Sequence, residues 1–101
     1  MKLIELNIEK IKALCRRYKV NTLAVFGSIL TDRFSEHSDV DLLVDFKEFD
    51  HQKEDYVTNY FNLKESLENL LGREVDLIEY GGIRNPLFKK SVDSKKVMIF
   101  G

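Results

Sequence analysis

Three aspartates and one glycine–serine pair have residue types and spacing that could do chemistry. Asp39 and Asp41 alternate in the apolar segment 39–46 (DVDLLVDF). Residues i and i+2 of a β-strand share a face, so both carboxylates point one way while Val40 and Leu42 face the core. The two charges repel each other, and a divalent cation removes that repulsion. A small number of hard oxygen ligands favours Mg²⁺ as this cation. Alternatively, the two aspartates belong to the solvated polar face of an edge strand and bind no metal.

Gly27 and Ser28 follow the short β-branched and aromatic run 22–26 (TLAVF), which predicts a buried strand. Glycine permits a close backbone approach or a positive φ, and serine is a good N-cap, so the pair predicts a strand-to-helix turn. Free N–H groups at a helix start attract phosphate oxygens, and the serine hydroxyl adds a donor. The pair therefore suggests a phosphate site, with a plain turn as the alternative.

Asp76 lies in the middle of the apolar segment 74–80 (EVDLIEY), between Val75 and Leu77. A charged residue inside a buried strand needs a partner. If this strand lies beside segment 39–46, Asp76 completes a three-carboxylate cluster. Such a cluster could hold two metal ions for an in-line phosphoryl displacement. A surface aspartate on an exposed strand face is the alternative.

Hydrophobic periodicity predicts the elements that would position these residues. The predicted elements are a helix over 4–18, strands over 22–26 and 39–46, a helix over 53–71 that ends before Gly72, a strand over 74–80, a helix from Pro86 capped by Asn85, and a strand over 97–100. This order indicates an α/β (α+β) fold in which a small mixed sheet has helices packed mainly on one face. We expect residues 1–101 to form a single domain.

Composition excludes several classes of protein. The 16 basic and 17 acidic residues give a net charge of -1, so general nucleic-acid binding is not expected. Cys15 is the single cysteine, which excludes an internal disulfide and a cysteine-built zinc site. No segment approaches the roughly 18 to 20 apolar residues that a membrane helix needs. The N-terminal segment lacks the apolar run of a secretory signal, so we expect a cytoplasmic protein without a membrane partner.

Residues 26–46 (FGSILTDRFSEHSDVDLLVDF) resemble the signature of the DNA polymerase β-type nucleotidyltransferase superfamily: Gly-Ser, a spacer and Asp-x-Asp. The resemblance continues through EVDLIEY to the C-terminal segment RNPLFKKSVDSKKVMIF. It is strongest to the minimal nucleotidyltransferases, the MNT proteins that pair with HEPN-domain partners as toxin–antitoxin systems. The resemblance therefore implies a HEPN-type protein partner and the nucleotidyltransferase fold of the polymerase β palm.

The resemblance also implies a role for each of the chemical residues. Asp39 and Asp41 would bind Mg²⁺, and Asp76 would be the third carboxylate, which aids deprotonation of the attacking hydroxyl. Gly27 and Ser28 would hold the triphosphate of ATP. In some members the reaction transfers AMP to a tyrosine of the HEPN toxin and silences it.

One segment departs from the pattern of the family. After Gly-Ser these proteins commonly carry a small residue and then Arg-Gly, where this chain has Leu30, Thr31 and Asp32. The change removes a planar phosphate ligand and adds a negative charge. We assign Arg33 and Ser38 to the nucleotide site as well. Four further basic residues could contact phosphate or a partner, or could equally form a solvated face: Arg73, Arg84, Lys89 and Lys90.

Two functions remain open at this level. The first is an enzyme that transfers a nucleoside monophosphate, AMP from ATP, to a hydroxyl on a macromolecular and preferably protein acceptor. The second is a catalytically weak or inactive antitoxin that neutralises its partner by contact alone. The altered loop favours the second function, whereas three converging carboxylates favour the first, because a pure binding module gains nothing from like charges held together.

Overall fold

The computed structural model describes residues 1–49 and 55–101, which contain a four-stranded sheet in the order β3-β2-β1-β4. The strands are β1 (Val20–Phe26), β2 (Val40–Phe46), β3 (Val75–Glu79) and β4 (Val97–Phe100). β1 is antiparallel to both β2 and β4, whereas β2 and β3 run parallel. The predicted mixed sheet is therefore confirmed, and all four predicted strands are present.

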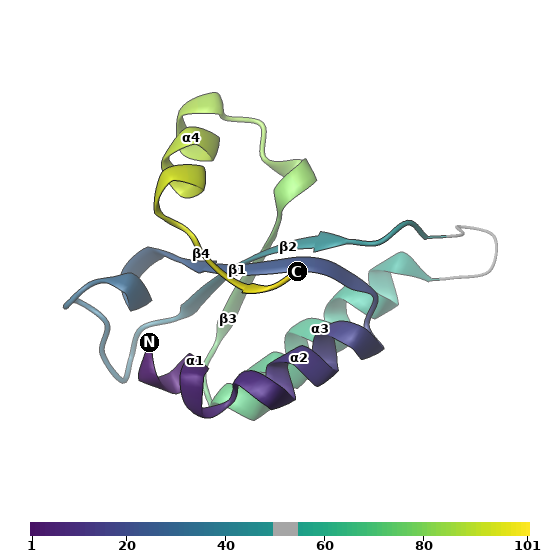
Figure 1. The fold of residues 1–101 in the computed structure, drawn as a ribbon, viewed down its shortest axis with the longest axis horizontal. Helices are drawn as coiled ribbons and strands as arrows, with labels where there is room; N and C mark the ends of the chain where they lie inside the picture. The colour runs from purple at the N-terminus through teal and green to yellow at the C-terminus, as the bar shows by residue number, and fades with distance from the viewer. Residues whose placement is uncertain (50–54) are drawn as a thin grey trace.

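The helices lie unequally on the two faces of the sheet. α1 (Lys2–Leu6), α2 (Ile8–Arg17) and α3 (Tyr56–Leu71) cover one face, and α4 (Pro86–Lys95) stands on the other (Figure 1). Two short 3₁₀ turns, η1 (Gly27–Leu30) and η2 (Tyr80–Gly82), follow β1 and β3. The prediction of helices mainly on one face is confirmed.

The main core lies between the sheet and the first three helices. Alternation along β2 directs Val40, Leu42 and Val44 into this core, and each is at most 1% exposed. From the helices, the buried residues that pack against the sheet are Ile4, Ile11, Cys15, Leu63, Leu67 and Leu71. The opposite alternation places Asp41 and Leu43 on the face that α4 covers.

The first predicted helix is divided in two at Asn7. The Asn7 side-chain amide donates a hydrogen bond to the Leu3 carbonyl (2.9 Å), and its backbone N–H bonds the Ile4 carbonyl (3.1 Å). Asparagine competes in this way with the helical ladder, so it favours an interruption. The predicted apolar face is correct, because Ile4 and Ile11 on either side of the break are both buried.

The later helices begin and end at their predicted signals. Gly72 ends α3 in the left-handed region with φ +66°. At the start of α4, the side-chain oxygen of Asn85 accepts hydrogen bonds from the backbone N–H groups of Leu87 and Phe88. The structure begins α3 at Tyr56, capped by Asp55, instead of at residue 53. Residues 53 and 54 of the predicted helix lie outside the described residues.

The α4 face of the sheet has a smaller cluster. Ala24, Phe26, Leu43 and Val92 are buried there, and Val92 is the single buried residue of α4. One buried side chain covers only a small part of a sheet face. The face that carries Asp41 is therefore partly open, which leaves room for a ligand.

Candidate active site

The centre of the candidate site is a contact between the turn after β1 and the start of β2. Phe26 and Asp41 are paired in the antiparallel register, which brings the Asp41 carboxylate over Gly27. A Cβ atom built on Gly27 would lie 2.2 Å from Asp41 Oδ2, and the φ of Gly27 is +78°. Both observations require glycine at this position. The predicted close backbone approach is thus a contact with a carboxylate of the site itself.

The Ser28 backbone N–H, next in the turn, lies near the Asp41 carboxylate and lowers its pKa. The Ser28 side chain does not cap η1, because Phe26 occupies the N-cap position and no side-chain cap bond forms there. The turn after β1 is therefore confirmed, but the capping role predicted for Ser28 is wrong. The reason is that η1 already begins at Gly27, so Ser28 lies inside the turn instead of at its N-cap.

Asp76 lies beside Asp41. β2 and β3 are parallel neighbours, and the Cα atoms of Asp41 and Asp76 are partners in their register. Residues paired in this way point to the same face, and Asp76 is exposed there. The strand adjacency on which the three-carboxylate interpretation depends is therefore present.

Three carboxylates share one electrostatic environment. Desolvation raises the pKa of Asp41 most, the charges of Asp76 and Asp39 raise it further, and the Ser28 N–H partly offsets these effects. An ionised Asp41 is consequently an unbalanced negative charge in the folded protein. A cation near Asp41 would relieve this repulsion.

The donor set fits Mg²⁺ better than a metal held entirely by protein. Among the described residues, no group of three His, Cys, Asp or Glu side chains is already arranged to hold one ion. Mg²⁺ commonly uses one or two carboxylates and completes its shell with water and substrate phosphates, so a closed protein cage is not needed. Asp39 and Asp76 are both exposed and can meet such a substrate.

The loop between η1 and β2 uses most of its polar side chains internally. Thr31 Oγ1 donates to the Ser28 carbonyl (2.8 Å) and accepts from the Arg33 backbone N–H (3.2 Å). Ser38 Oγ accepts from the Ser35 backbone N–H (3.0 Å). Of the two residues assigned to the nucleotide site from this loop, Ser38 is therefore engaged within the loop, whereas Arg33 is exposed.

Arg73, which the sequence left open to phosphate or partner contacts, binds the loop before β2. Its guanidinium donates to the carbonyls of Ser35 and Ser38, the second at 3.0 Å, and lies 4.4 Å from the centre of the Phe34 ring. It fixes the loop that leads directly into Asp39. Arg73 is thus a positioning residue, a role that depends on long-range contacts that sequence spacing does not reveal.

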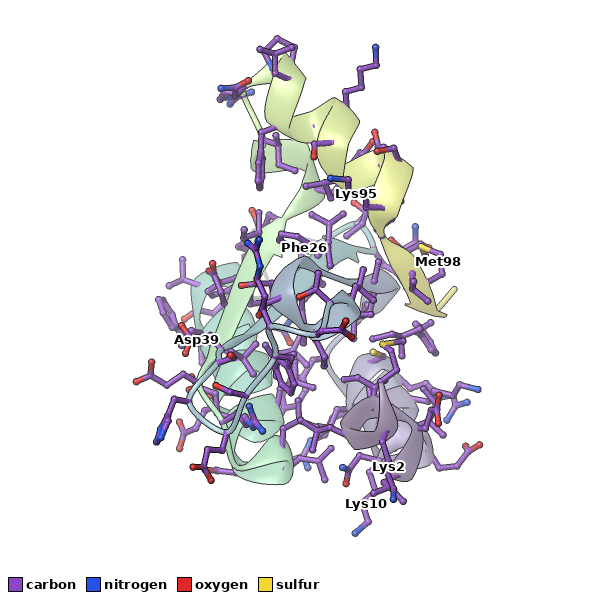
Figure 2. The ribbon with its side chains drawn as sticks, turned by 90° about the vertical axis from the view of Figure 1, so that its left-hand side faces the viewer. Lys2, Lys10, Phe26, Asp39, Lys95 and Met98 are labelled. Atoms are coloured by element: carbon purple, nitrogen blue, oxygen red, sulfur yellow. The ribbon has the colours of Figure 1, made fainter. Side chains whose placement is uncertain are left out.

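A cleft of about 650 Å³, absent from the predictions made from the sequence, opens beside Gly27. Phe26, Gly27, Leu30 and Thr31 form one wall, and α4 contributes the other wall through Phe88, Ser91, Val92 and Lys95. Figure 2 shows Lys95 at the lower end of α4, next to Phe26. The only signal in the sequence was the spacing of the four α4 residues, which places them on one helical face.

Comparison with known proteins identifies the class that this geometry belongs to. The model of the family described as polymerase beta nucleotidyltransferase matches residues 9–101. A Methanocaldococcus jannaschii protein provisionally named protein adenylyltransferase is 39% identical over 88 residues, which cover 87% of this chain and 85% of that relative. The chain therefore belongs to the polymerase β nucleotidyltransferase family, and it is a nucleotidyltransferase.

Solved structures show the same fold. A structure provisionally named minimal nucleotidyltransferase superposes with a TM-score of 0.76 at 29% identity and covers 95% of this chain and 92% of its own. A chain from the Shewanella oneidensis complex of a tri-AMPylated HEPN toxin with an MNT antitoxin gives 0.66 at 22% identity, over 96% of this chain and 71% of its own. The resemblance to minimal nucleotidyltransferases is confirmed. Among the helices of the described ranges, none is long and apolar enough to cross a membrane.

Proposed function

We propose that the protein transfers AMP from ATP to a hydroxyl group of a protein acceptor in a Mg²⁺-dependent reaction, and that it acts as the antitoxin of a HEPN-type toxin. One observation carries the proposal: the Asp41 carboxylate rests on the Gly27–Ser28 turn, beside Asp76 and within the electrostatic reach of Asp39. A phosphate-binding turn and three carboxylates in one place are what phosphoryl transfer needs.

The residues of the site suggest how the reaction proceeds. The oxygen of the acceptor hydroxyl attacks the α-phosphorus of ATP, the bond from that phosphorus to the bridging oxygen breaks, and pyrophosphate leaves. Asp39, Asp41 and Asp76 would hold Mg²⁺, which supplies charge neutralisation on the phosphate oxygens. Asp76 would take the proton of the attacking hydroxyl. The backbone of Gly27 and Ser28 would orient the triphosphate.

The position of Asp76 favours a macromolecular acceptor. β3 is an edge strand of the sheet, and Asp76 on it is exposed. An acceptor that carries its hydroxyl on its own surface can therefore approach Asp76 from solvent. The tri-AMPylated HEPN toxin seen with an MNT antitoxin of the same fold supports a HEPN protein as this acceptor.

The cytoplasm is the compartment that fits this activity. ATP and Mg²⁺ are available there, and its reducing conditions suit a single free cysteine, Cys15. No disulfide is available to stabilise the fold, because the chain has only one cysteine.

The test is transfer of label from α-labelled ATP to candidate HEPN-domain acceptors in the presence of Mg²⁺. Label is expected on the acceptor with the wild type and not with Asp39→Ala/Asp41→Ala. Asp45→Ala is the matched control, because Asp45 lies further along β2 and binds Asn21 at 3.0 Å. Label that survives the double substitution would remove the carboxylates from the mechanism.

The altered loop favours a second candidate function. Thr31 is bonded to the Ser28 carbonyl, and Asp32 places a negative charge near the turn where phosphates would bind. This arrangement suits an antitoxin that neutralises by contact alone. The same experiment separates the two functions: absence of label, with the double variant still neutralising the toxin, would favour contact.

A further inference from the structure

The proposed nucleotide site would carry an excess of negative charge when a triphosphate is bound. A triphosphate brought to Asp39, Asp41 and Asp76 meets carboxylates, and bound Mg²⁺ neutralises only part of the total negative charge. The turn itself supplies no cationic side chain, because its positions after Ser28 are Ile29, Leu30, Thr31 and Asp32. Arg33, the cation that we assign to the site from the following loop, does not line the cleft beside Gly27, so a cation from another element would supply the positive charge there.

α4 offers a face that looks into the cleft beside Gly27. Phe88, Ser91, Val92 and Lys95 follow the spacing i, i+3, i+4 and i+7, and all four line the cleft. Of the residues that line this cleft, Lys95 alone is charged. The positive charge therefore lines the same cleft as Gly27 of the turn after β1. Figure 2 shows Lys95 near Phe26, the residue that precedes this turn.

Lys95 differs from the other lysines at this end of the chain. Lys89 Nζ lies 4.8 Å from the centre of the Tyr80 ring, and Lys96 Nζ is paired with Asp93 Oδ1 at 2.9 Å. Lys95 is exposed, and within the part of the chain that the structure describes no hydrogen bond or ion pair engages its ammonium group. Lys90 is also exposed, but it does not line the cleft.

We propose that the Lys95 ammonium binds the phosphate chain of the nucleoside triphosphate and replaces the cation that the turn after Ser28 lacks. The proposal rests on the proposed function and adds a residue to its nucleotide site. The rest of the cleft wall fits a nucleotide as well, because Phe26 and Phe88 present aromatic rings 6.2 Å apart beside Val92. One cation next to an apolar wall matches a ligand that joins phosphates to a base.

The test measures binding by calorimetry with three probes in the presence of Mg²⁺: ATP, inorganic tripolyphosphate and adenosine. Lys95→Ala is expected to weaken the binding of ATP and of tripolyphosphate by about tenfold or more, because a charge-assisted bond is lost. The affinity for adenosine should be unchanged. Lys95→Arg is expected to retain most of the affinity. Lys10→Ala, at an exposed lysine of α2 on the opposite face of the sheet, is the matched control and should bind all three probes like the wild type.

Other outcomes have distinct meanings. One outcome would overturn the role of Lys95 and leave the proposed function intact: the wild type binds ATP and transfers AMP, and Lys95→Ala binds tripolyphosphate as tightly as the wild type does. Equal losses for adenosine and tripolyphosphate in Lys95→Ala would also overturn it, because they would indicate damage to the wall rather than a lost charge. Wild type that binds no nucleotide would refute both proposals.

Discussion

Gly27 carries the strictest steric requirement of any single residue in the site. Gly27→Ala should destabilise the fold more than Gly72→Ala, although both glycines have positive φ. The shared backbone cost is roughly 1 kcal/mol, but only Gly27→Ala drives a Cβ atom into Asp41, since nothing lies within 4 Å at Gly72. Urea unfolding measures both costs. Displacement of Asp41 should also lower the rate of transfer about 100-fold.

The steric origin of this effect has its own control. Adding Asp41→Ala to Gly27→Ala removes the carboxylate that the new Cβ atom would meet. Measured against Asp41→Ala alone, the added Gly27→Ala should then cost only about as much stability as Gly72→Ala costs the wild type, a non-additive result typical of residues in contact. Equal destabilisation by Gly27→Ala and Gly72→Ala from the start would show that the turn relaxes.

Cys15 gives a prediction about pH. Burial raises the pKa of the Cys15 thiol from 9.0 to about 12, while Arg16 lowers it slightly. Because the folded pKa is the higher one, the contribution of the thiol to stability is complete below pH 9 and is lost as pH rises towards 12. Iodoacetamide should therefore label the folded protein very slowly at pH 8.5 and the urea-unfolded protein readily. Rapid labelling without denaturant would contradict the burial of Cys15.

The residues of the site differ in how visible they are in the sequence. Asp39, Asp41 and Gly27 are predictable, because each stands out by type within or directly after an apolar strand. Arg73 and Lys95 are not, because the segments that they face, the loop before β2 and the turn after β1, are distant in the chain. Arg73 binds carbonyls 35 and 38 residues away, and no local spacing encodes such a contact.

At the scale of elements, the loop before β2 depends on Arg73. Arg73→Ala should cost about 1 to 2 kcal/mol, because it removes charged hydrogen bonds to two loop carbonyls and the contact with Phe34. Transfer should slow more than tenfold, since this loop delivers Asp39. Urea unfolding and the labelling assay measure the two effects. Arg84→Ala is the control, because Arg84 is exposed. Equal rates of transfer in the two variants would refute the positioning role of Arg73.

The helix caps give a second prediction at this scale. Asn85 caps α4 and Asp55 caps α3, and each accepts a backbone N–H through its side chain. Loss of a cap costs about 1 kcal/mol. Asn85→Ala should unprotect the amides of α4 in hydrogen exchange, because that ten-residue helix buries only Val92.

Asp55→Ala serves as the comparison for the cap of α4. α3 buries Leu63, Leu67 and Leu71 against the sheet, so its central amides should stay protected after the same chemical change. An equally small loss of protection in both helices would mean that α4 is held by contacts beyond Val92.

Most elements were predictable because their signals are local. Gly72 and Asn85 mark helix ends by their own conformational preferences. Asn7 shows the limit of this approach: the periodicity of apolar residues continues through it, but its side chain bonds the Leu3 carbonyl and divides the helix. Periodicity reports the buried face and is insensitive to a break of one residue.

At the scale of the whole molecule, the two faces of the sheet have different tasks. One face is closed by α1, α2 and α3, and it supplies the main core. The other is only partly covered by α4, and it holds Asp41, Asp76 and the cleft. Alternation along β2 predicts which residues share a face, but the pairing of β2 with β3 is a long-range choice that the strands do not specify individually.

Charge balance on the open face leads to a prediction for the whole fold. Asp39→Asn/Asp41→Asn should raise the stability of the ligand-free protein at neutral pH, because the ionised Asp41 is repelled by Asp39 and Asp76 and is partly desolvated. The same variant should lose stabilisation by Mg²⁺ and ATP. For the wild type, ligand at 100 times its Kd adds about 2.7 kcal/mol, or roughly 10 to 20 °C in Tm for a domain of this size.

Thermal unfolding of both proteins with Mg²⁺ and ATP, with ATP and EDTA, and without ligand tests this prediction. The wild type should start lower and rise only when Mg²⁺ and ATP are both present, whereas the variant should start higher and stay there. Opposite signs for the two effects are expected because the carboxylates that destabilise the free fold are those that we propose to bind the metal. If ATP in EDTA shifts both proteins equally, nucleotide binding does not depend on the carboxylates, and the proposed assignment of Asp39 and Asp41 is wrong.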